Sequence, residues 1–124
     1  MAINTIVNLN IRKWPASDYT LRLSEGDNQP QLNVLIYDGD EAVEFENVYQ
    51  QPKLVMKIGD KRYVSTGYAI SYHGILDAWF TSINRANDMK AGTGYGYVVV
   101  RRYDGTLKFS TQRFKVEVLE RGDK

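Results

Sequence analysis

The feature that most constrains this fold lies between residues 92 and 120, where two apolar-rich segments flank the dipeptide Asp104–Gly105. Asp-Gly between strand-like segments predicts a two-residue β-hairpin turn, because both central residues of that turn adopt positive φ. The hairpin would then carry a largely aliphatic face made of Val98, Val100, Arg102, Leu107, Phe109 and Thr111. Its other face would hold Tyr95, Tyr97, Val99, Arg101 and Tyr103 opposite Thr106, Lys108, Ser110 and Gln112. This division is typical of an antiparallel pair that covers a core on one side.

After the hairpin the apolar positions change parity, because Phe114 and Val116 are even-numbered whereas Leu107 and Phe109 are odd-numbered. Side chains along a strand repeat every two residues, so this change requires a bulge or a passage between sheets near Thr111–Arg113. We therefore expect a core that includes Val98, Val100, Leu107, Phe109, Val116 and Val118.

The rest of the chain also consists of short alternating segments separated by turn signals. Strands are expected within residues 2–12, 19–23, 32–37, 42–46, 54–58, 63–65, 68–72 and 75–80. Helical signals are confined to Ser82–Lys90, where Ser82 is a candidate N-cap and Gly92 a stop. The sequence thus predicts an all-β fold, an antiparallel β-sandwich with at most one short helix. Its length of 124 residues suits a single domain spanning residues 1–124.

Composition excludes several classes of function. The chain has no cysteine, so disulfides, zinc–thiolate sites and a thiol nucleophile are ruled out together. A net charge of +1 gives no overall field that would favour nucleic acid or anionic lipid, and we expect neither as a partner. No apolar run is long enough for membrane insertion, and the first residues do not have the pattern of a signal peptide.

The sequence also offers little for catalysis, a cofactor or a metal. His73 is the single histidine, and no G-x-S-x-G motif accompanies it, so we expect a structural or solvated histidine. The acidic residues Asp38, Asp40, Glu41, Glu44 and Glu46 lack the spacing of a calcium loop and suit a protected sheet edge. Residues 92–96 have the wrong spacing for a dinucleotide site and are interpreted as a flexible entry to the hairpin. We therefore predict no enzyme activity, no cofactor and no metal site.

The most suggestive surface is the polar face of the hairpin, with Tyr95, Tyr97, Arg101 and Tyr103 as candidate binding residues. Tyrosine and arginine are enriched at the centres of protein interfaces, and aromatic rings also stack on sugars or bases. The alternative is that these rings pack beneath a neighbouring strand or the 82–90 segment. Trp79 and Phe80 are expected in the core, whereas the position of Trp14 before Pro15 leaves its burial open.

Several motifs in order resemble a known family. Leu23-x-Glu25-Gly26-Asp27-x-x-Pro30 precedes the segment Leu32-x-Val34-x-Ile36 and Tyr37-Asp38-Gly39, and Lys90-Ala91-Gly92, Asp104-Gly105, Ser110-Thr111 and Phe114-x-Val116-x-Val118 follow. This arrangement, over roughly residues 20–120, resembles the immunoglobulin-like N-terminal domain of baseplate upper proteins of siphophages that infect Gram-positive bacteria. The chain departs from that family at Glu44-Phe45-Glu46, where the family tends to have an aspartate–leucine–threonine turn.

The resemblance implies an immunoglobulin-like sandwich and a structural role in a phage tail or baseplate, by protein–protein contact that helps attach or organise host-recognition components. Members of the family often continue into coiled-coil or helical segments, so a chain that ends after the domain implies a small accessory protein of the virion, made in the host cytoplasm. Its expected partners are other baseplate or tail proteins, with a homo-oligomer and a host saccharide as further options. The alternative function is a carbohydrate-binding module that recognises host cell-wall polysaccharide. The resemblance supplies no catalytic residues.

Overall fold

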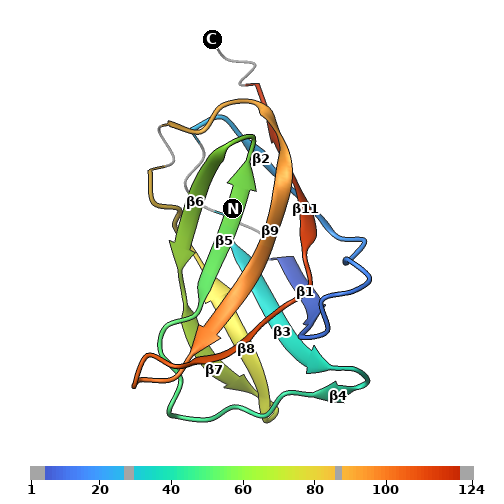
Figure 1. The fold of residues 1–124 in the computed structure, drawn as a ribbon, viewed down its shortest axis with the longest axis vertical. Helices are drawn as coiled ribbons and strands as arrows, with labels where there is room; N and C mark the ends of the chain where they lie inside the picture. Colours follow the sequence, from blue (N-terminus) through green and yellow to red (C-terminus); the bar gives the residue numbers. More distant parts are fainter. Residues whose placement is uncertain (1–4, 27–29, 86–87, 121–124) are drawn as a thin grey trace.

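A computed structural model describes residues 5–26, 30–85 and 88–120, which form two β-sheets packed face to face (Figure 1). The five-stranded sheet contains β1 (Thr5–Asn10), β3 (Leu32–Asp38), β4 (Glu41–Ala42), β7 (Tyr68–Tyr72) and β8 (Ile75–Phe80). The six-stranded sheet contains β2 (Thr20–Ser24), β5 (Lys53–Ile58), β6 (Lys61–Thr66), β9 (Gly92–Arg101), β10 (Leu107–Ser110) and β11 (Phe114–Leu119). The predicted all-β sandwich is confirmed.

Strands that follow one another in the sequence are distributed over both sheets. One sheet runs β1-β3-β8-β7, with β4 beside β3, and the other runs β2-β11-β9-β5-β6, with β10 beside β9. The sheets are mixed rather than purely antiparallel, because β1 pairs in parallel with β3 and β2 pairs in parallel with β11. Both parallel pairs involve the first two strands, whose alternation alone could not reveal their direction.

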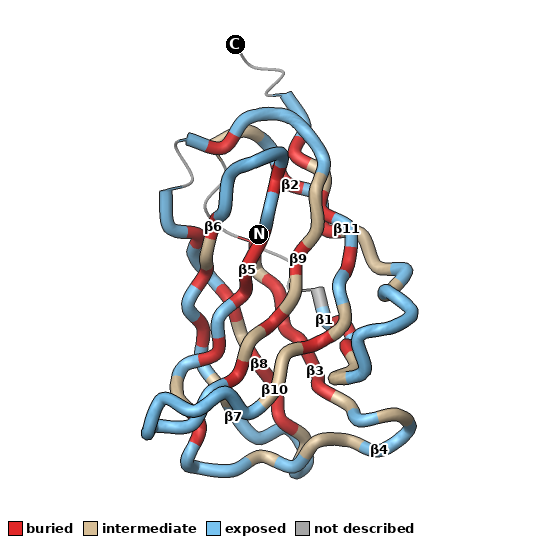
Figure 2. Tube along the Cα trace, viewed as in Figure 1, coloured by how far each residue is buried: buried red, intermediate tan, exposed pale blue. Residues whose placement is uncertain are grey.

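The core lies between the sheets and follows the period-two alternation of the sequence. From Gly96 onward, buried positions alternate with intermediate ones along β9, and along β11 they alternate with exposed or intermediate ones (Figure 2). Four members of the predicted core are buried, namely Val98, Val100, Val116 and Val118. Phe109 is half-buried and packs edge-on against Tyr49, with ring centroids 6.1 Å apart. Phe80 is fully buried, whereas the prediction for Trp79 was wrong, because it lies half-buried on the outer face of β8.

Leu107 was predicted to be buried and is instead 55% exposed, because the hairpin turn differs from the expected one. The turn has a three-residue loop, in which Gly105 N–H donates to the Arg102 carbonyl at 2.8 Å and Gly105 alone among the loop residues has positive φ. Such a loop is a type I turn followed by a glycine bulge. With this loop Leu107 pairs with the outward-facing Arg101, and a register shift before Phe109, which pairs with Val100, returns Phe109 to the core side.

The parity change after the hairpin arises from a further bulge. Thr111 N–H donates to the Val98 carbonyl at 2.9 Å, whereas Phe114 pairs with Gly96. Between these two pairings the chain advances three residues on one side, from Thr111 to Phe114, but only two on β9, from Val98 to Gly96. The additional residue is the extra residue of a bulge. Strands β10 and β11 stay in the same sheet, so the bulge expected near Thr111–Arg113 is confirmed and no passage between sheets occurs.

The glycine-rich segment 92–96 is a paired strand, so the interpretation as a flexible entry was wrong. Strand β9 begins at Gly92 and pairs with β5 on one side and β11 on the other. A Cβ at Gly94 would lie 1.8 Å from the Lys57 carbonyl oxygen, and a Cβ at Gly96 would lie 2.8 Å from the Phe114 ring. These glycines are therefore needed for close approach of backbone and ring rather than for flexibility.

The segment expected as a short helix forms none over its described residues. Asn84 and Arg85 lie in a turn, a single residue of 3₁₀ conformation is found at Asp88, and residues 86–87 lie outside the described part of the chain. Ile83 and Met89 are buried and anchor this connection against the core. Burial of these two side chains thus positions the connection, and a helix of only about two turns would contribute little stability of its own.

Replacing Gly94 with alanine should destabilise the fold markedly. The new Cβ would overlap the Lys57 carbonyl, and relieving the overlap would force β5 and β9 apart. We expect the free energy of unfolding to fall by at least about 1–3 kcal/mol, measured by urea denaturation. Gly92→Ala is the matched control, because a Cβ there would meet only an Ile58 methyl carbon at 3.6 Å. Equal losses of unfolding free energy in the two variants would show that the close approach of β5 and β9 at Gly94 does not limit stability.

Candidate binding surface

The outer face of the six-stranded sheet carries the residues that the sequence singled out. Tyr95, Tyr97 and Arg101 alternate along β9 with the buried Gly96, Val98 and Val100, so they point away from the core. Tyr95 and Tyr97 are half-buried on the central strand β9, where β5 pairs with both residues and β11 pairs with Tyr95. The prediction that this face is separate from the core is therefore correct.

Tyr95 and Tyr97 form one cluster together with a residue that the sequence reasoning missed. Their rings stack at 20° with centroids 6.4 Å apart. The guanidinium carbon of Arg113 lies 4.1 Å from the centroid of the Tyr95 ring, which is cation–π geometry. Arg113 reaches this position because it follows the bulge between β10 and β11.

Arg101 and Tyr103 belong to the hairpin end and are not part of that cluster. Arg101 donates to the Gly105 carbonyl at 3.2 Å, which holds its side chain toward the turn. Tyr103 is 70% exposed, and its backbone N–H donates to the Val48 carbonyl at 2.9 Å. The four predicted residues therefore divide into a stacked pair on the sheet and a second pair at the tip.

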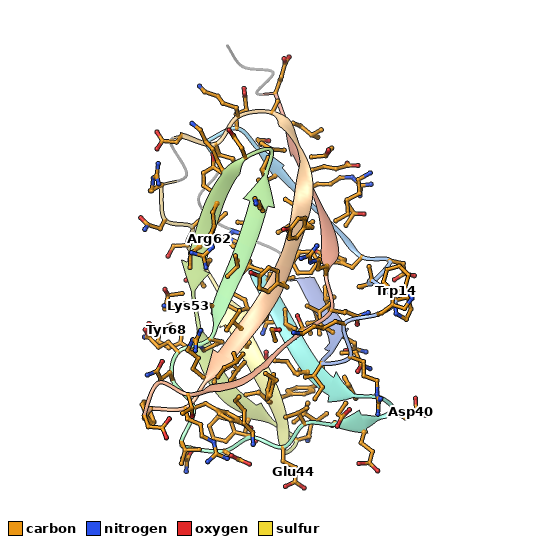
Figure 3. All side chains as sticks on the ribbon, in the orientation of Figure 1. Trp14, Asp40, Glu44, Lys53, Arg62 and Tyr68 are labelled. Atoms are coloured by element: carbon orange, nitrogen blue, oxygen red, sulfur yellow. The ribbon has the colours of Figure 1, made fainter. Side chains whose placement is uncertain are left out.

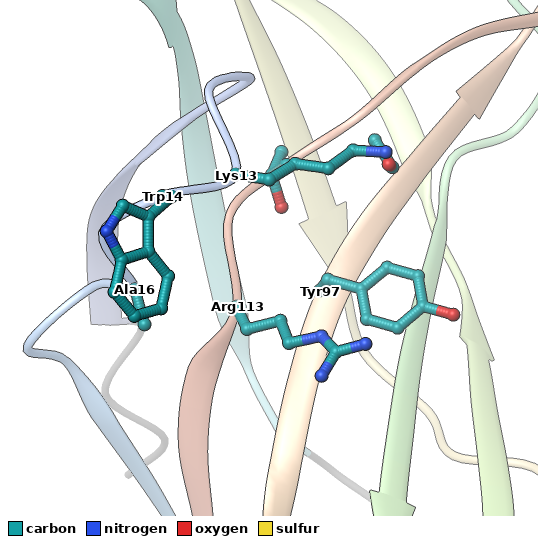
Figure 4. A pocket seen from close by; sticks show the side chains of 7 residues that line it. Lys13, Trp14, Ala16, Tyr97 and Arg113 are labelled. Atoms are coloured by element: carbon teal, nitrogen blue, oxygen red, sulfur yellow. The ribbon is translucent and has the colours of Figure 1, made fainter.

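A cleft of about 520 Å³ opens beside the tyrosine pair (Figure 4). It is lined by Lys13, Trp14, Ala16, Tyr97, Ser110, Thr111 and Arg113. Trp14 and Tyr97 contribute aromatic rings from opposite sides, and the Arg113 side chain extends toward Tyr97. Trp14 is 87% exposed, which settles the question that the sequence left open.

The walls of the cleft are fixed by hydrogen bonds between segments far apart in the sequence. Gln112 accepts from the Asn10 N–H at 2.8 Å and donates from its side chain to the Pro15 carbonyl at 2.9 Å. The Ser17 N–H donates to the Arg113 carbonyl at 2.8 Å. These bonds tie the backbone of the connection between β1 and β2 to the bulge between β10 and β11.

Positive charge dominates the outer face of this sheet. Its outward cations are Arg22, Lys53, Lys57, Arg62, Arg101, Arg113 and Lys115, of which Lys53 and Arg62 are labelled in Figure 3. Along the strands, Glu117 is the acidic residue on this face, and it pairs with Lys115 at 3.1 Å and Arg22 at 3.2 Å. The hydrogen bond from Lys115 lowers the pKa of the Glu117 carboxyl group, which therefore stays ionised.

The outer face of the five-stranded sheet has a different character that the sequence reasoning missed. Four exposed apolar or aromatic residues lie on its edge strands, at Ile6, Tyr68, Ile70 and Tyr72. Their exposed fractions range from 46% to 63%. The expected strand at 68–72 was correct, but nothing in its alternation could show that it would be an uncovered edge.

Asp77 lies buried at the centre of this second face, beside Asn33. The Asn33 side-chain amide donates to both Asp77 carboxylate oxygens at 3.4 Å, and Asn33 Oδ1 has no hydrogen-bond partner among the described residues. Burial raises the pKa of Asp77, and the hydrogen bond from Asn33 only partly opposes the shift.

The other residues considered for catalysis or metal binding do not lie together in one site. His73 is exposed in the turn between β7 and β8, where it has φ of 50° and packs edge-on against Tyr72. Among the described residues, no group of three or more histidine, cysteine or acidic side chains could hold a metal ion. The acidic residues near β4 instead form separate ion pairs, such as Arg12 with Asp38 at 3.5 Å and Arg102 with Glu46 at 3.9 Å.

Comparisons with known proteins do not assign the chain to a family. The sequence matches no protein-family model, and a search of curated proteins gives no match either. Over the described residues, no helix has the length and apolar character needed to cross a membrane.

Replacing Asp77 with asparagine should stabilise the protein at neutral pH. Because burial raises the folded-state pKa above the unfolded value, the free energy of unfolding falls as the pH rises through that interval. At every pH above the folded-state pKa of Asp77, the parent keeps this lower free energy of unfolding. Asp77→Asn removes the buried charge, and its amide nitrogen can donate to Asn33 Oδ1. We expect a higher free energy of unfolding than the parent at pH 7, with a smaller difference near pH 3.

Urea denaturation between pH 3 and 8 would measure this effect. Asp18→Asn serves as the control, because Asp18 is exposed and its charge loses little hydration on folding. A variant at position 77 that is less stable than the parent at pH 7 would mean that the bonds from Asn33 outweigh the cost of burial.

Proposed function

We propose that the chain is a binding module of a phage tail or baseplate that acts by protein–protein contact and helps attach or organise host-recognition components. The proposal combines the family resemblance of its motifs with the chemistry of the outer face of the six-stranded sheet. It places the protein in the virion, with other tail or baseplate proteins as partners.

The observation that carries this proposal is the set of tyrosine and arginine side chains that face away from the core. Tyrosine and arginine are the residue types that most often anchor protein interfaces once water is excluded. Tyr97 is already held by its neighbour Tyr95, so little side-chain entropy remains to be lost on binding. Arg101 and Tyr103 extend the same face to the hairpin tip.

A function in binding rather than catalysis also fits the surroundings of His73, the single histidine of the chain. His73 contacts an aromatic ring in an exposed turn, and among the described residues its side chain has no hydrogen-bond partner that would orient it as a base. General-base chemistry requires a base within hydrogen-bond reach of the group it deprotonates.

A second candidate function is carbohydrate binding. It is favoured by the cleft between Trp14 and Tyr97, since aromatic walls with nearby polar groups suit a sugar ring. A glycan array separates the two candidates, because a module that acts only through protein contact should bind no sugar.

Tyr97→Ala and Arg101→Ala test the protein contact. Each substitution should weaken binding to purified baseplate proteins by about 30-fold, which corresponds to an anchor contribution of about 2 kcal/mol. Binding would be measured by calorimetry after circular dichroism confirms that each variant folds.

Tyr68→Ala is the matched control, because Tyr68 is an exposed tyrosine on the opposite sheet. Unchanged binding by the variants at positions 97 and 101, with a loss at position 68, would move the contact to the five-stranded sheet. If all three variants bind as the parent does, neither face is the interface.

A further inference from the structure

The cleft beside Tyr97 combines two aromatic walls with two cations. Trp14 lies on one side and Tyr97 on the other, with Lys13 and Arg113 at the rim (Figure 4). Its volume of about 520 Å³ falls in the range of small-ligand sites. A flat ring with apolar C–H groups can pack against such walls by dispersion.

The charges of this cleft have no carboxylate partner. None of the ion pairs among the described residues involves Lys13 or Arg113, and no acidic residue lines the cleft. Arg113 contacts the Tyr95 ring instead, which fixes the guanidinium without neutralising it. The hydrogen-bonding groups of both cations are donors only, so they match anionic oxygens.

Two aliphatic hydroxyl groups also line the cleft. Thr111 is buried, and its Oγ1 already accepts from the Val98 N–H and donates to the Gln112 carbonyl. Ser110 is half-buried and supplies a hydroxyl at the cleft wall. A site for a neutral sugar would need acceptors for the sugar hydroxyls, and this cleft has few of them.

The site is also preorganised. Gln112 bonds to the backbone of Asn10 and Pro15, and Ser17 bonds to the backbone of Arg113. The backbone on both sides of the cleft is therefore fixed before any ligand arrives, which lowers the entropic cost of binding, although the exposed Trp14 side chain would still lose rotamer freedom.

We propose that this cleft binds an acidic saccharide unit, a sugar ring bearing a carboxylate or phosphate group. The ring packs between Trp14 and Tyr97, and the anionic group bonds to Arg113 and Lys13. The surrounding cations of the sheet face attract such a ligand over a longer range. The proposal rests on the second candidate function above, carbohydrate binding.

The test uses the full chain and five probes: glucuronate, glucose 6-phosphate, glucose, inorganic phosphate and an oligo-dT eight nucleotides long. Affinities are measured by ligand-observed NMR at low salt, and tryptophan fluorescence gives a second readout through the exposed Trp14. We expect glucuronate or glucose 6-phosphate to bind at least tenfold more tightly than glucose and than phosphate alone. The two acidic sugars distinguish a carboxylate from a phosphate as the preferred group.

Arg113→Gln and Lys13→Gln should each weaken binding of the acidic sugar at least tenfold. Arg62→Gln is the matched control, because it removes an exposed arginine from the same sheet outside the cleft, and it should change affinity less than threefold. Thermal unfolding verifies that each variant is folded. Lys13 lies in an exposed connection outside the strands, so Lys13→Gln keeps the test decisive if Arg113→Gln does not fold.

Each remaining outcome overturns the proposal in a different way. Equal binding of glucose and the acidic sugars would keep carbohydrate binding and remove the acidic preference. Binding of phosphate as tight as that of glucose 6-phosphate would show that packing of a sugar between Trp14 and Tyr97 contributes nothing to affinity. Tighter binding of oligo-dT would indicate a nucleic-acid surface, and no binding of any sugar would remove both the acidic site and the second candidate function.

Discussion

The contact on which this structure most depends is the close approach of two backbones at Gly94. Strand β9 lies between β5 and β11, and at this position the Lys57 carbonyl occupies the space that any side chain would need. The fixed register points Val98 into the core and Tyr97 out of it. The position of the candidate binding surface is therefore a direct consequence of how tightly the central strands pack.

Much of this arrangement could be predicted from alternation. The inward direction of Val98 and Val116, the outward direction of Tyr95 and Tyr97, and the bulge after the hairpin all follow from the two-residue period of strands. The prediction failed for Leu107 because Asp104–Gly105 is compatible with two loop lengths. A loop that is longer by one residue places the residue after it on the opposite face of the hairpin.

The cleft could not be predicted in the same way. Trp14 and Arg113 are almost a hundred positions apart, and neither belongs to a periodic segment. What brings them together is a pair of hydrogen bonds between the Gln112 side chain and the backbone of Asn10 and Pro15, for which the sequence carries no local signal. Net charge could not reveal the cationic face either, because a value of +1 for the whole chain does not show that cations gather on one sheet.

The connections between the sheets have a mechanical consequence. Gly67 alone separates β6, an edge of one sheet, from β7, an edge of the other, and its N–H donates to the Pro52 carbonyl at 2.9 Å. On the opposite side, β1 and β2 are likewise the edges of different sheets. At each open side of the sandwich, one continuous segment of chain thus connects the edge strands of the two sheets. Fraying of either sheet at its margin would strain the margin of the other, so the two layers should open cooperatively rather than one at a time.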